Sequence, residues 1–360
     1  MPTDPSPSIL LVTPGRDPVG TGRETELLAE DMRAAGRTVH VAVMSRGGAV
    51  PDRLAAQGIP VHRLGRRPEV DVAAAARLTM LARRLRPAVV IVAGRSLLAA
   101  AAAVKLARPQ THVVARLAAT VVRPLHTRAL RQIDLVLATS PVVAASCRSD
   151  WSGPRVEIVA PGITADPGRG LDRAAIASHL GLDPAKIWTL CVAPLVAASK
   201  LERLIWAIDQ LGVVHKGLEH VLVGSGPLLP RVRRRARVQE LADRLVVLPH
   251  CDLLPDLLGQ VRLVWQSGQV AFGGALLDAM ASGVPTVAVE SEAARQLIVD
   301  GETGRIVPAI PESEFPRRAF GIIEDDALAA RYGAAGRARA ETEFAADRMV
   351  AGVLAALDAA

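Results

Sequence analysis

Residues 9–43 decide the fold and read ILLVTPGRDPVGTGRETELLAEDMRAAGRTVHVAV. An apolar run at 9–12 is followed by a turn and by an amphipathic stretch at 24–35, which Gly36 closes before a second apolar run at 39–43. Apolar residues spaced three and four apart predict a helix, whereas short apolar runs bounded by turns predict buried strands. The stretch therefore predicts a β-loop-α-β unit.

The same alternation continues along the chain and restarts near residue 187. In the first half, further strands are predicted at 61–64, 89–92, 112–115 and 135–138, with a helix at 71–85. In the second half, strands are predicted at 188–193, 220–223, 245–248, 263–265 and 286–289, with helices at 201–211, through the 230s and at 273–282. Strands separated by helices call for parallel sheets covered on both faces. We therefore predict an α/β protein with two doubly wound, Rossmann-like domains that face each other across a cleft at the carboxyl ends of their strands.

The domain boundaries are predicted from the shifts between these patterns. The expected segments are an N-terminal domain at 1–166, a proline- and glycine-rich linker or hinge at 167–186, a C-terminal domain at 187–340 and a C-terminal helix at 341–360 that packs back on the first domain. The alanine-rich region 327–359 is predicted to be helical, with interruptions at Gly333 and Gly336 because glycine disfavours helix interiors.

The amino-acid composition favours some classes of binding partner and disfavours others. The net charge is +7 and aromatic residues make up only 2% of the chain. The positive charge suits acidic partners such as nucleotide diphosphates or anionic lipid, whereas the scarcity of aromatics argues against binding of single-stranded nucleic acid. The three cysteines are too scattered for a disulfide framework or a zinc site, and we expect them to be buried: Cys147, Cys191 and Cys251.

Targeting signals are not evident. The N-terminus MPTDPSPS lacks the basic and apolar regions of a signal peptide, and no apolar run reaches the length of a membrane span. We expect a cytoplasmic protein, with peripheral contact to an anionic membrane compatible with its charge. The basic clusters at 66–67 and 83–86 are the membrane candidates, whereas the arginine run at 231–237 is interpreted first as a solvated helix face and second as a surface for lipid or another polyanion.

Residues 269–280, QVAFGGALLDAM, resemble a phosphate-binding turn. Gly273 and Gly274 open a short apolar helix whose free N–H groups can hold an anion, and Asp278 follows one turn later. We favour a phosphate or nucleotide site, although a tight strand-to-helix turn would also need small residues, and an acidic residue in a first helical turn is favourable for dipole reasons alone. The pattern by itself leaves both interpretations open.

Two more features fit an anion or nucleotide site. Gly224 and Gly226 follow a predicted strand and allow close approach of a nucleotide to the backbone, although a bare turn would need them too. Lys200 precedes a predicted helix, where it either pairs with a diphosphate or is a solvated residue.

Several strings occur in a characteristic order. They are AG at 35–36, ATS at 138–140, APG at 160–162, Lys200, GSGP at 224–227, DAMASGVP at 278–285 and DGETG at 300–304. None is decisive alone, but together they resemble the GT-B glycosyltransferases of family 4, which are retaining enzymes that use nucleotide-activated sugars. The resemblance covers nearly the whole chain and is densest from 187 to 308.

The resemblance implies roles for particular residues. Lys200 would stabilise the leaving diphosphate and would be the catalytic residue. The residues expected to bind the nucleotide-sugar donor are Gly224, Gly226, Ser267, Gly273, Gly274 and Asp278, with Gly20 and Gly22 as the remnant of a glycine-rich loop in the first, acceptor-side domain. The acceptor would be a saccharide or a lipid-linked molecule, and no metal is expected.

Several positions depart from the family pattern. Pro194 stands where an arginine would contact the diphosphate, and Val270 stands where a glutamate would contact the donor sugar. A histidine near the acceptor would fall near Arg116 or Leu117. Two hypotheses therefore remain: a sugar transferase, or a catalytically impaired homologue that binds nucleotide sugars or serves as a partner subunit. The nucleotide base, the sugar, the acceptor and the oligomeric state are not specified by the sequence.

Overall fold

A computed structural model describes most of the chain, and the chain divides into two compact units. One unit is Met1–Gly162 with Phe344–Ala360, and the other is Ile163–Glu343. The described residues are 8–15, 19–44, 48–65, 72–121, 124–148, 153–268 and 274–359.

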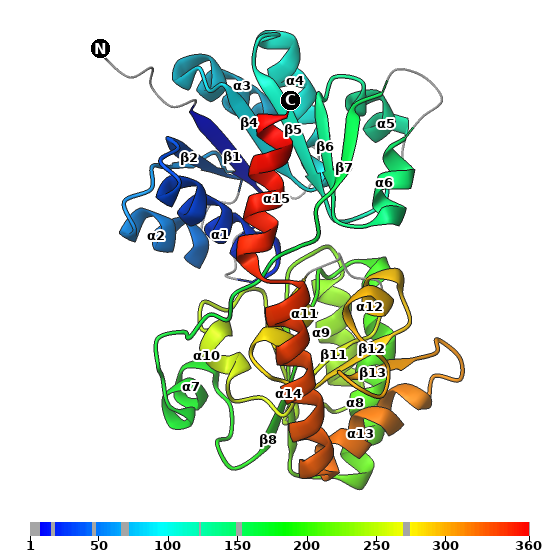
Figure 1. The fold of residues 1–360 in the computed structure, drawn as a ribbon. Helices are drawn as coiled ribbons and strands as arrows, with labels where there is room; N and C mark the ends of the chain where they lie inside the picture. The colour runs from blue at the N-terminus through cyan, green and yellow to red at the C-terminus, as the bar shows by residue number, and fades with distance from the viewer. Residues whose placement is uncertain are drawn as a thin grey trace. The chain divides into compact units, whose positions relative to one another are not determined.

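The first unit is built on a seven-stranded parallel sheet with the order β3-β2-β1-β4-β5-β6-β7 (Figure 1). Its strands are β1 Ile9–Thr13, β2 Val39–Val43, β3 Val61–Arg63, β4 Val89–Ala93, β5 His112–Leu117, β6 Leu135–Ala138 and β7 Arg155–Ile158. Its helices are α1 Thr21–Ala34, α2 Ala49–Ala56, α3 Val72–Leu85, the 3₁₀ turn η1 Arg95–Leu97, α4 Leu98–Ala107, α5 Pro124–Leu130, α6 Pro141–Cys147 and α15 Ala346–Asp358.

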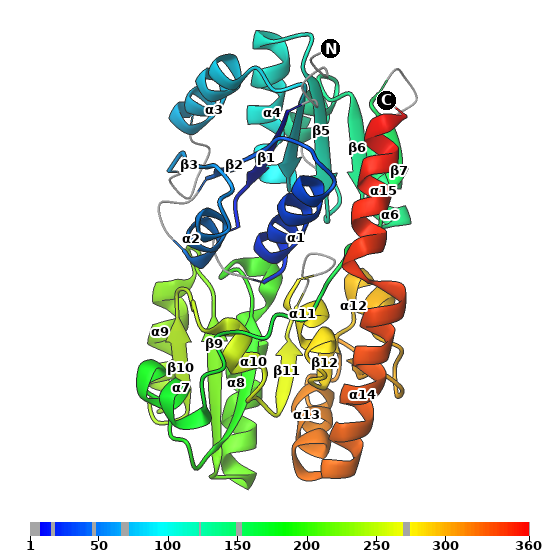
Figure 2. The same ribbon diagram turned by 60° about the vertical axis from the view of Figure 1, so that its left-hand side comes forward.

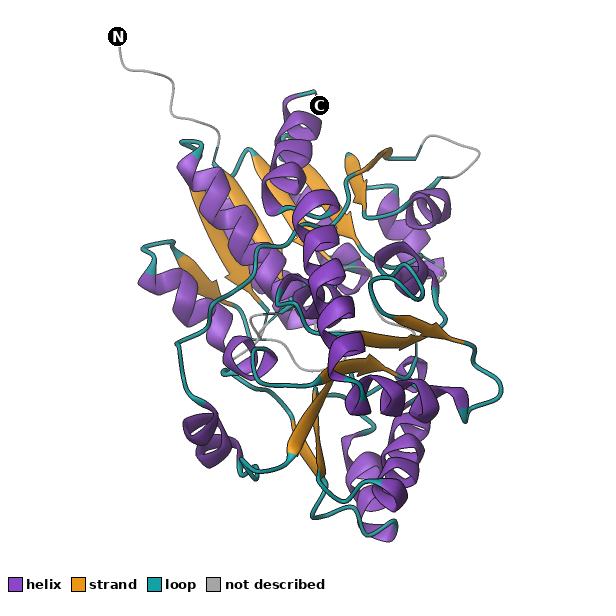
Figure 3. Ribbon diagram, turned by 60° about the horizontal axis from the view of Figure 1, so that its bottom comes forward, coloured by secondary structure: helices purple, strands orange, loops and turns teal. Residues whose placement is uncertain are grey.

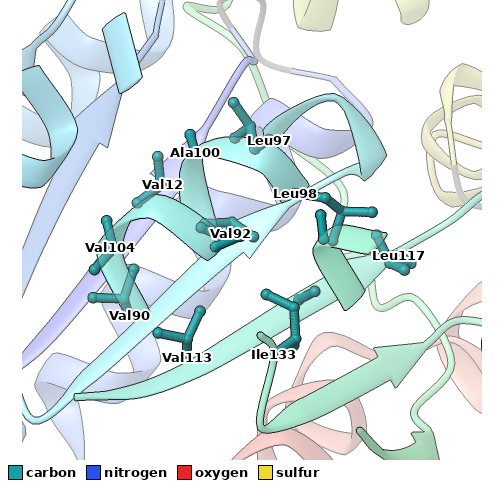
Figure 4. Close-up of a cluster of buried hydrophobic side chains, with 14 of the residues drawn as sticks. Val12, Val90, Val92, Leu97, Leu98, Ala100, Val104, Val113, Leu117 and Ile133 are labelled. Carbon is teal, nitrogen blue, oxygen red and sulfur yellow. The ribbon is translucent and has the colours of Figure 1, made fainter. Parts of the chain in front are cut away.

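Both faces of this sheet are apolar, which is why helices cover both. Side chains alternate along β1, so that Leu10 and Val12 join one buried cluster while Ile9 and Leu11 join another. Figure 4 shows the first cluster, in which valines of β1, β4 and β5 pack against Leu98 and neighbouring residues of α4. The second cluster is formed with α1, α2 and the C-terminal α15, and Figure 2 shows α1 and α15 on the same face of the sheet.

The second unit repeats the architecture with a six-stranded parallel sheet in the order β10-β9-β8-β11-β12-β13. Its strands are β8 Ile187–Val192, β9 Leu218–Val223, β10 Leu245–Leu248, β11 Leu263–Gln266, β12 Thr286–Val289 and β13 Arg305–Val307. Its helices are α7 Arg173–Leu180, the 3₁₀ turn η2 Ala197–Ser199, α8 Leu201–Val214, α9 Leu229–Val238, α10 Leu254–Leu258, α11 Ala275–Ala281, α12 Glu292–Leu297, α13 Glu314–Glu324 and α14 Asp326–Glu343 (Figure 3). The prediction of two doubly wound α/β domains is confirmed. None of the described helices is both long and apolar enough to cross a bilayer.

Helix α14 corrects one prediction. It runs without a break through Gly333 and Gly336, and the chain leaves the helix only after Glu343. A Cβ added at Gly333 would lie 2.1 Å from the carbonyl oxygen of Gly283, and one added at Gly336 would lie 3.4 Å from that of Thr303. Gly333 therefore permits close packing of α14, which outweighs its low helix propensity of about 1 kcal/mol, whereas a Cβ at Gly336 would make only an ordinary contact.

Replacement of Gly333 by alanine tests this packing. We expect Gly333→Ala to lower the free energy of unfolding by about 2 kcal/mol, because the added methyl group meets backbone that cannot easily move. The matched control is Gly321→Ala in α13, where an added Cβ would meet no atom within 4 Å. Chemical denaturation should show the control unchanged or stabilised by up to about 1 kcal/mol. Equal effects of the two changes would contradict the packing role.

His220 is a fully buried polar side chain in β9. Its Nδ1 lies 2.6 Å from the hydroxyl of Thr189, and its ring centroid lies 5.5 Å from that of Trp265. Nε2 is buried and has no hydrogen-bond partner among the described residues. Burial lowers the pKa of His220 to about 3, so the imidazole is neutral in the folded protein at neutral pH.

Acid should destabilise the second unit through His220. As the pH falls below about 6.5, unfolded His220 takes up a proton that the folded side chain does not accept until the pH approaches its lowered pKa. Between pH 7.5 and pH 5, this difference should cost about 2 kcal/mol of unfolding free energy. Chemical denaturation across that range should show a flatter pH dependence for His220→Gln than for the wild type. Identical slopes would contradict the assignment.

Candidate functional site

The strand order of the second sheet indicates where a ligand can bind. β9 and β10 follow β8 on one side, and the chain then returns to place β11 on the other side of β8. The loops that follow β8 and β11 therefore leave the sheet in different directions at neighbouring carboxyl ends. In doubly wound sheets such a switch point is where ligands bind. The loop after β8 carries Lys200, and the loop after β11 begins with Ser267.

Lys200 lies in the first of these loops, and its conformation and charge are both energetically unfavourable there. It is exposed, it forms the N-cap of α8, and its φ of 49° and ψ of 45° lie in the left-handed region. A left-handed lysine costs about 1–2 kcal/mol, and a cation at a helix N-terminus is disfavoured by the helix dipole. No ion pair joins the Lys200 amine to any described residue. The amine is therefore available to an anion.

The loop that carries Lys200 is fixed by the turn after β9. Leu195 N donates to the carbonyl of Ser225 at 2.9 Å, and Leu228 N donates to the carbonyl of Leu195 at 3.0 Å. A Cβ added at Gly224 would lie 1.9 Å from the carbonyl oxygen of Ala193, and one added at Gly226 would lie 2.5 Å from that of Leu195. These two glycines allow one loop to approach the other, which is a structural need that the sequence pattern does not reveal.

Ser267 fixes the same loop from the opposite side. Its hydroxyl donates to the carbonyl of Ser199 at 2.8 Å, and the side chain is buried. The next residue, Gly268, has no room for a side chain, because an added Cβ would lie 2.5 Å from the carbonyl oxygen of Ala198. The Ser199 hydroxyl in turn donates to the carbonyl of Pro194 at 2.5 Å. The structure thus brings Lys200, Gly224, Gly226 and Ser267 into one set of contacting loops.

The phosphate-helix segment is described only in part. Gly273 and Val270 lie outside the described residues, and α11 begins at Ala275 with Gly274 as its N-cap. Asp278 lies in the first turn of α11 and is only 6% exposed. A buried carboxylate at this place is compatible with a ligand contact as well as with support of the helix.

In the first unit, the predicted glycines lie after β1, which is again at a switch point because β1 lies between β2 and β4. Gly20 is the N-cap of α1 with a φ of 52°, and Gly22 lies in the first turn. A Cβ added at Gly15 would lie 2.7 Å from the Cα of Gly22. The glycines therefore let the end of β1 and the start of α1 pass close to each other.

Arg116 is a buried charge whose partners could not be inferred from the sequence. It lies in β5 with 3% of its surface exposed. Its guanidinium donates to the carboxylate of Glu24 at 2.6 Å and to the carbonyls of Val159 and Ala160 at 2.5 and 3.0 Å. The side chain therefore joins the start of α1 to the chain that leaves β7. The available signal is an arginine inside the otherwise apolar run VVARL.

Within the part of the chain that the structure describes, no group of three or more histidine, cysteine, aspartate or glutamate residues is placed to hold a metal ion.

Family models match both halves of the chain. Residues 19–166 match the model described as Glycosyltransferase Family 4, and residues 187–325 match the one described as Glycosyl transferases group 1. The chain is a GT-B protein resembling glycosyltransferase family 4.

Curated relatives of this GT-B protein are glycosyltransferases by name. The phosphatidyl-myo-inositol mannosyltransferase of Mycobacterium leprae is 31% identical over 130 residues, which are 35% of this chain and 32% of the relative. The lipopolysaccharide core biosynthesis mannosyltransferase of Rhizobium meliloti is 27% identical over 227 residues, which are 61% of this chain and 64% of the relative. The matched region spans about a third of the first relative and less than two thirds of the second.

Solved structures share the fold over the whole length. Anabaena HepE in complex with UDP and glucose matches with a TM-score of 0.79 and 17% identity, covering 98% of this chain and 100% of that one. The sucrose-phosphate synthase of Thermosynechococcus elongatus matches with a TM-score of 0.77 and 18% identity, covering 98% of both chains. At these identities the likeness shows the fold alone.

Gly224→Ala tests the contact that fixes the Lys200 loop. We expect a loss of about 2–3 kcal/mol of unfolding free energy, because the new methyl group overlaps the carbonyl of Ala193. The control is Gly181→Ala, which has a φ of 70° but no atom within 4 Å of the added Cβ, so it should cost only about 1 kcal/mol of backbone strain. Denaturation curves compare the two. A Gly224 variant no less stable than the Gly181 variant would show that the loop adjusts freely.

Proposed function

We propose that this GT-B protein transfers a sugar from a nucleotide-sugar donor to a saccharide or lipid-linked acceptor. The observation that carries the proposal is Lys200, whose side chain is exposed and whose backbone is held in the left-handed conformation at a switch point. Transfer of a sugar from such a donor releases a diphosphate, so negative charge grows on the leaving group. A cation held in place before the reaction stabilises that charge without reorganising.

The surrounding loops support a donor site at this edge. Lys200 is the N-cap of α8, and its loop is bound on both sides by the turn at 224–228 and by Ser267. A site built on a fixed backbone holds a cation where charge develops. In this proposal, Gly224, Gly226 and Ser267 shape the nucleotide site, and Gly273, Gly274 and Asp278 complete it. The retaining course of the reaction rests on the family resemblance.

The acceptor side is assigned to the first unit. Gly20 and Gly22 begin α1 at its switch point, and Arg116 holds Glu24 beside them. A lipid-linked acceptor is compatible with the exposed face of α3, where Val72 and Met80 are 77% and 60% exposed. Arg83 and Arg84 are exposed on the same helix. Apolar and basic side chains on one helix are the composition that binds an anionic membrane surface.

A specific observation also favours the second candidate function, a catalytically impaired homologue that binds a nucleotide sugar or acts as a partner subunit. Pro194 supplies its carbonyl to Ser199 and has no charge or donor to offer a diphosphate. Binding without turnover would support this second function.

Nucleotide binding and sugar turnover by the wild type separate the two functions, and Lys200→Ala tests the role of the lysine. We expect the wild type to bind one of UDP, GDP or ADP in calorimetric titrations and to hydrolyse or transfer the sugar of the matching donor. Lys200→Ala should reduce the rate by about 10²–10³-fold, because the leaving diphosphate loses its cation. The control is Lys186→Ala, which removes a lysine just before the amino end of the same strand, β8, and should leave the rate unchanged.

Three outcomes are decisive. Failure to bind any of the three nucleotides would overturn both functions that depend on a nucleotide, the transferase and the nucleotide-sugar-binding homologue. Binding without measurable turnover would favour the impaired homologue. Activity that survives Lys200→Ala would refute the role given to this lysine.

A further inference from the structure

Arg203 is a second cation at the switch point of the second unit. It lies three residues after Lys200 in the first turn of α8, and its backbone N–H donates to the carbonyl of Lys200 at 3.0 Å. Its guanidinium donates to the carbonyl of Ser267 at 2.9 Å and to the carbonyl of Ala309 at 3.2 Å. The side chain therefore bridges the chain segments that follow β11 and β13.

The charge of Arg203 is incompletely neutralised. Its side chain is 13% exposed, and its nearest carboxylate, Glu312, is 3.6 Å away and 54% exposed. Nε is buried and has no hydrogen-bond partner among the described residues. The guanidinium donates to two neutral carbonyls, and its ion pair with the exposed Glu312 is long and screened by water. Its positive charge therefore remains able to stabilise a bound anion.

The contact with Ser267 also sets the path of the chain. Ser267 and Gly268 are held against Ser199 and Ala198 from one side, and Arg203 holds the Ser267 carbonyl. These contacts fix where the chain leaves β11 on its way to α11. The planar guanidinium makes two directed hydrogen bonds at once. A lysine could supply the charge but could not make the same pair of hydrogen bonds.

We propose that Arg203 is a positioning residue of the donor site, which fixes the exit of β11 and adds a second positive charge to Lys200 for the diphosphate of a nucleotide ligand. This inference rests on the proposed function. It predicts that the effect of Arg203 grows with the number of phosphates on the ligand. A purely structural role would weaken all nucleotide ligands alike.

The experiment compares three ligands on the full chain. Wild type is first titrated with UDP, GDP and ADP, and the base that binds is then tested as diphosphate, monophosphate and nucleoside. For Arg203→Gln we expect diphosphate affinity to fall about tenfold or more, the monophosphate to lose less and the nucleoside to change by less than about twofold. Arg203→Lys should bind the diphosphate more tightly than Arg203→Gln does, because it keeps the charge.

The matched control is Arg262→Gln. Arg262 lies at the amino end of β11 and donates to two carbonyls, those of Ile322 and Ile323, at 3.2 and 3.0 Å. It also pairs with Asp326 at 2.7 Å. It therefore makes the same kind of contacts as Arg203 at the opposite edge of the sheet, and its loss should leave all three affinities unchanged.

The outcomes separate the two proposals. If the wild type binds none of the nucleotides, the proposed function fails. If the wild type binds but Arg203→Gln weakens diphosphate and nucleoside equally, or matches Arg262→Gln, the inference about Arg203 is overturned. Should Arg203→Gln fail to fold, Arg203→Met carries the test, because it also removes the charge: an equal loss for diphosphate and nucleoside would overturn the inference, and a loss that grows with the number of phosphates would support it.

Discussion

The close approach of two backbone loops at the carboxyl end of β8 is the constraint on which the candidate site depends. Gly224 and Gly226 leave no space between their own backbone and the carbonyls of Ala193 and Leu195. This contact, with the hydrogen bond from Ser267 to Ser199, holds the loop that ends in Lys200. A lysine can remain in a left-handed conformation at a helix N-terminus only where its surroundings impose it. The contacts that fix this loop therefore set the position of the Lys200 backbone before a ligand binds.

The two units use the same topology for different local chemistry. Each sheet has a switch point beside its first strand, and near each one glycines permit close backbone contacts, Gly15 with Gly22 in the first unit and Gly224 with Ala193 in the second. In the second unit the cations near the switch point are Lys200, which has no ion pair with a described residue, and Arg203, which pairs with Glu312 at 3.6 Å. In the first unit the Arg116 charge is matched by Glu24 and by two backbone carbonyls. The Arg116 guanidinium contacts a carboxylate at 2.6 Å, whereas the Lys200 amine has no ion pair with a described residue. This difference is why we propose the diphosphate site in the second unit.

The local sequence pattern predicted the positions of the strands well, but it did not predict the structural role of single residues. The predicted strand 135–138 matches β6, and 245–248 matches β10, because short apolar runs between turns have few alternatives in a parallel sheet. Gly333 and Gly336 were expected to interrupt a helix, yet α14 continues through both, and at Gly333 close packing requires the absence of a side chain. Propensity is a local property, and here a contact with a distant residue outweighed it.

The sequence by itself determined the alternation of strands and helices, the two α/β halves and the place of Lys200 at the start of a helix, since each follows from residues that are neighbours along the chain. Only the tertiary structure decided what Gly224 and Gly226 make room for, that Ser267 binds the Lys200 loop and that Arg203 reaches the end of β11. Arg203 and Ser267 are 64 residues apart in the chain. Their contact arises from the order of strands in the sheet, in which β11 returns to lie beside β8, and no local pattern of residues specifies that order.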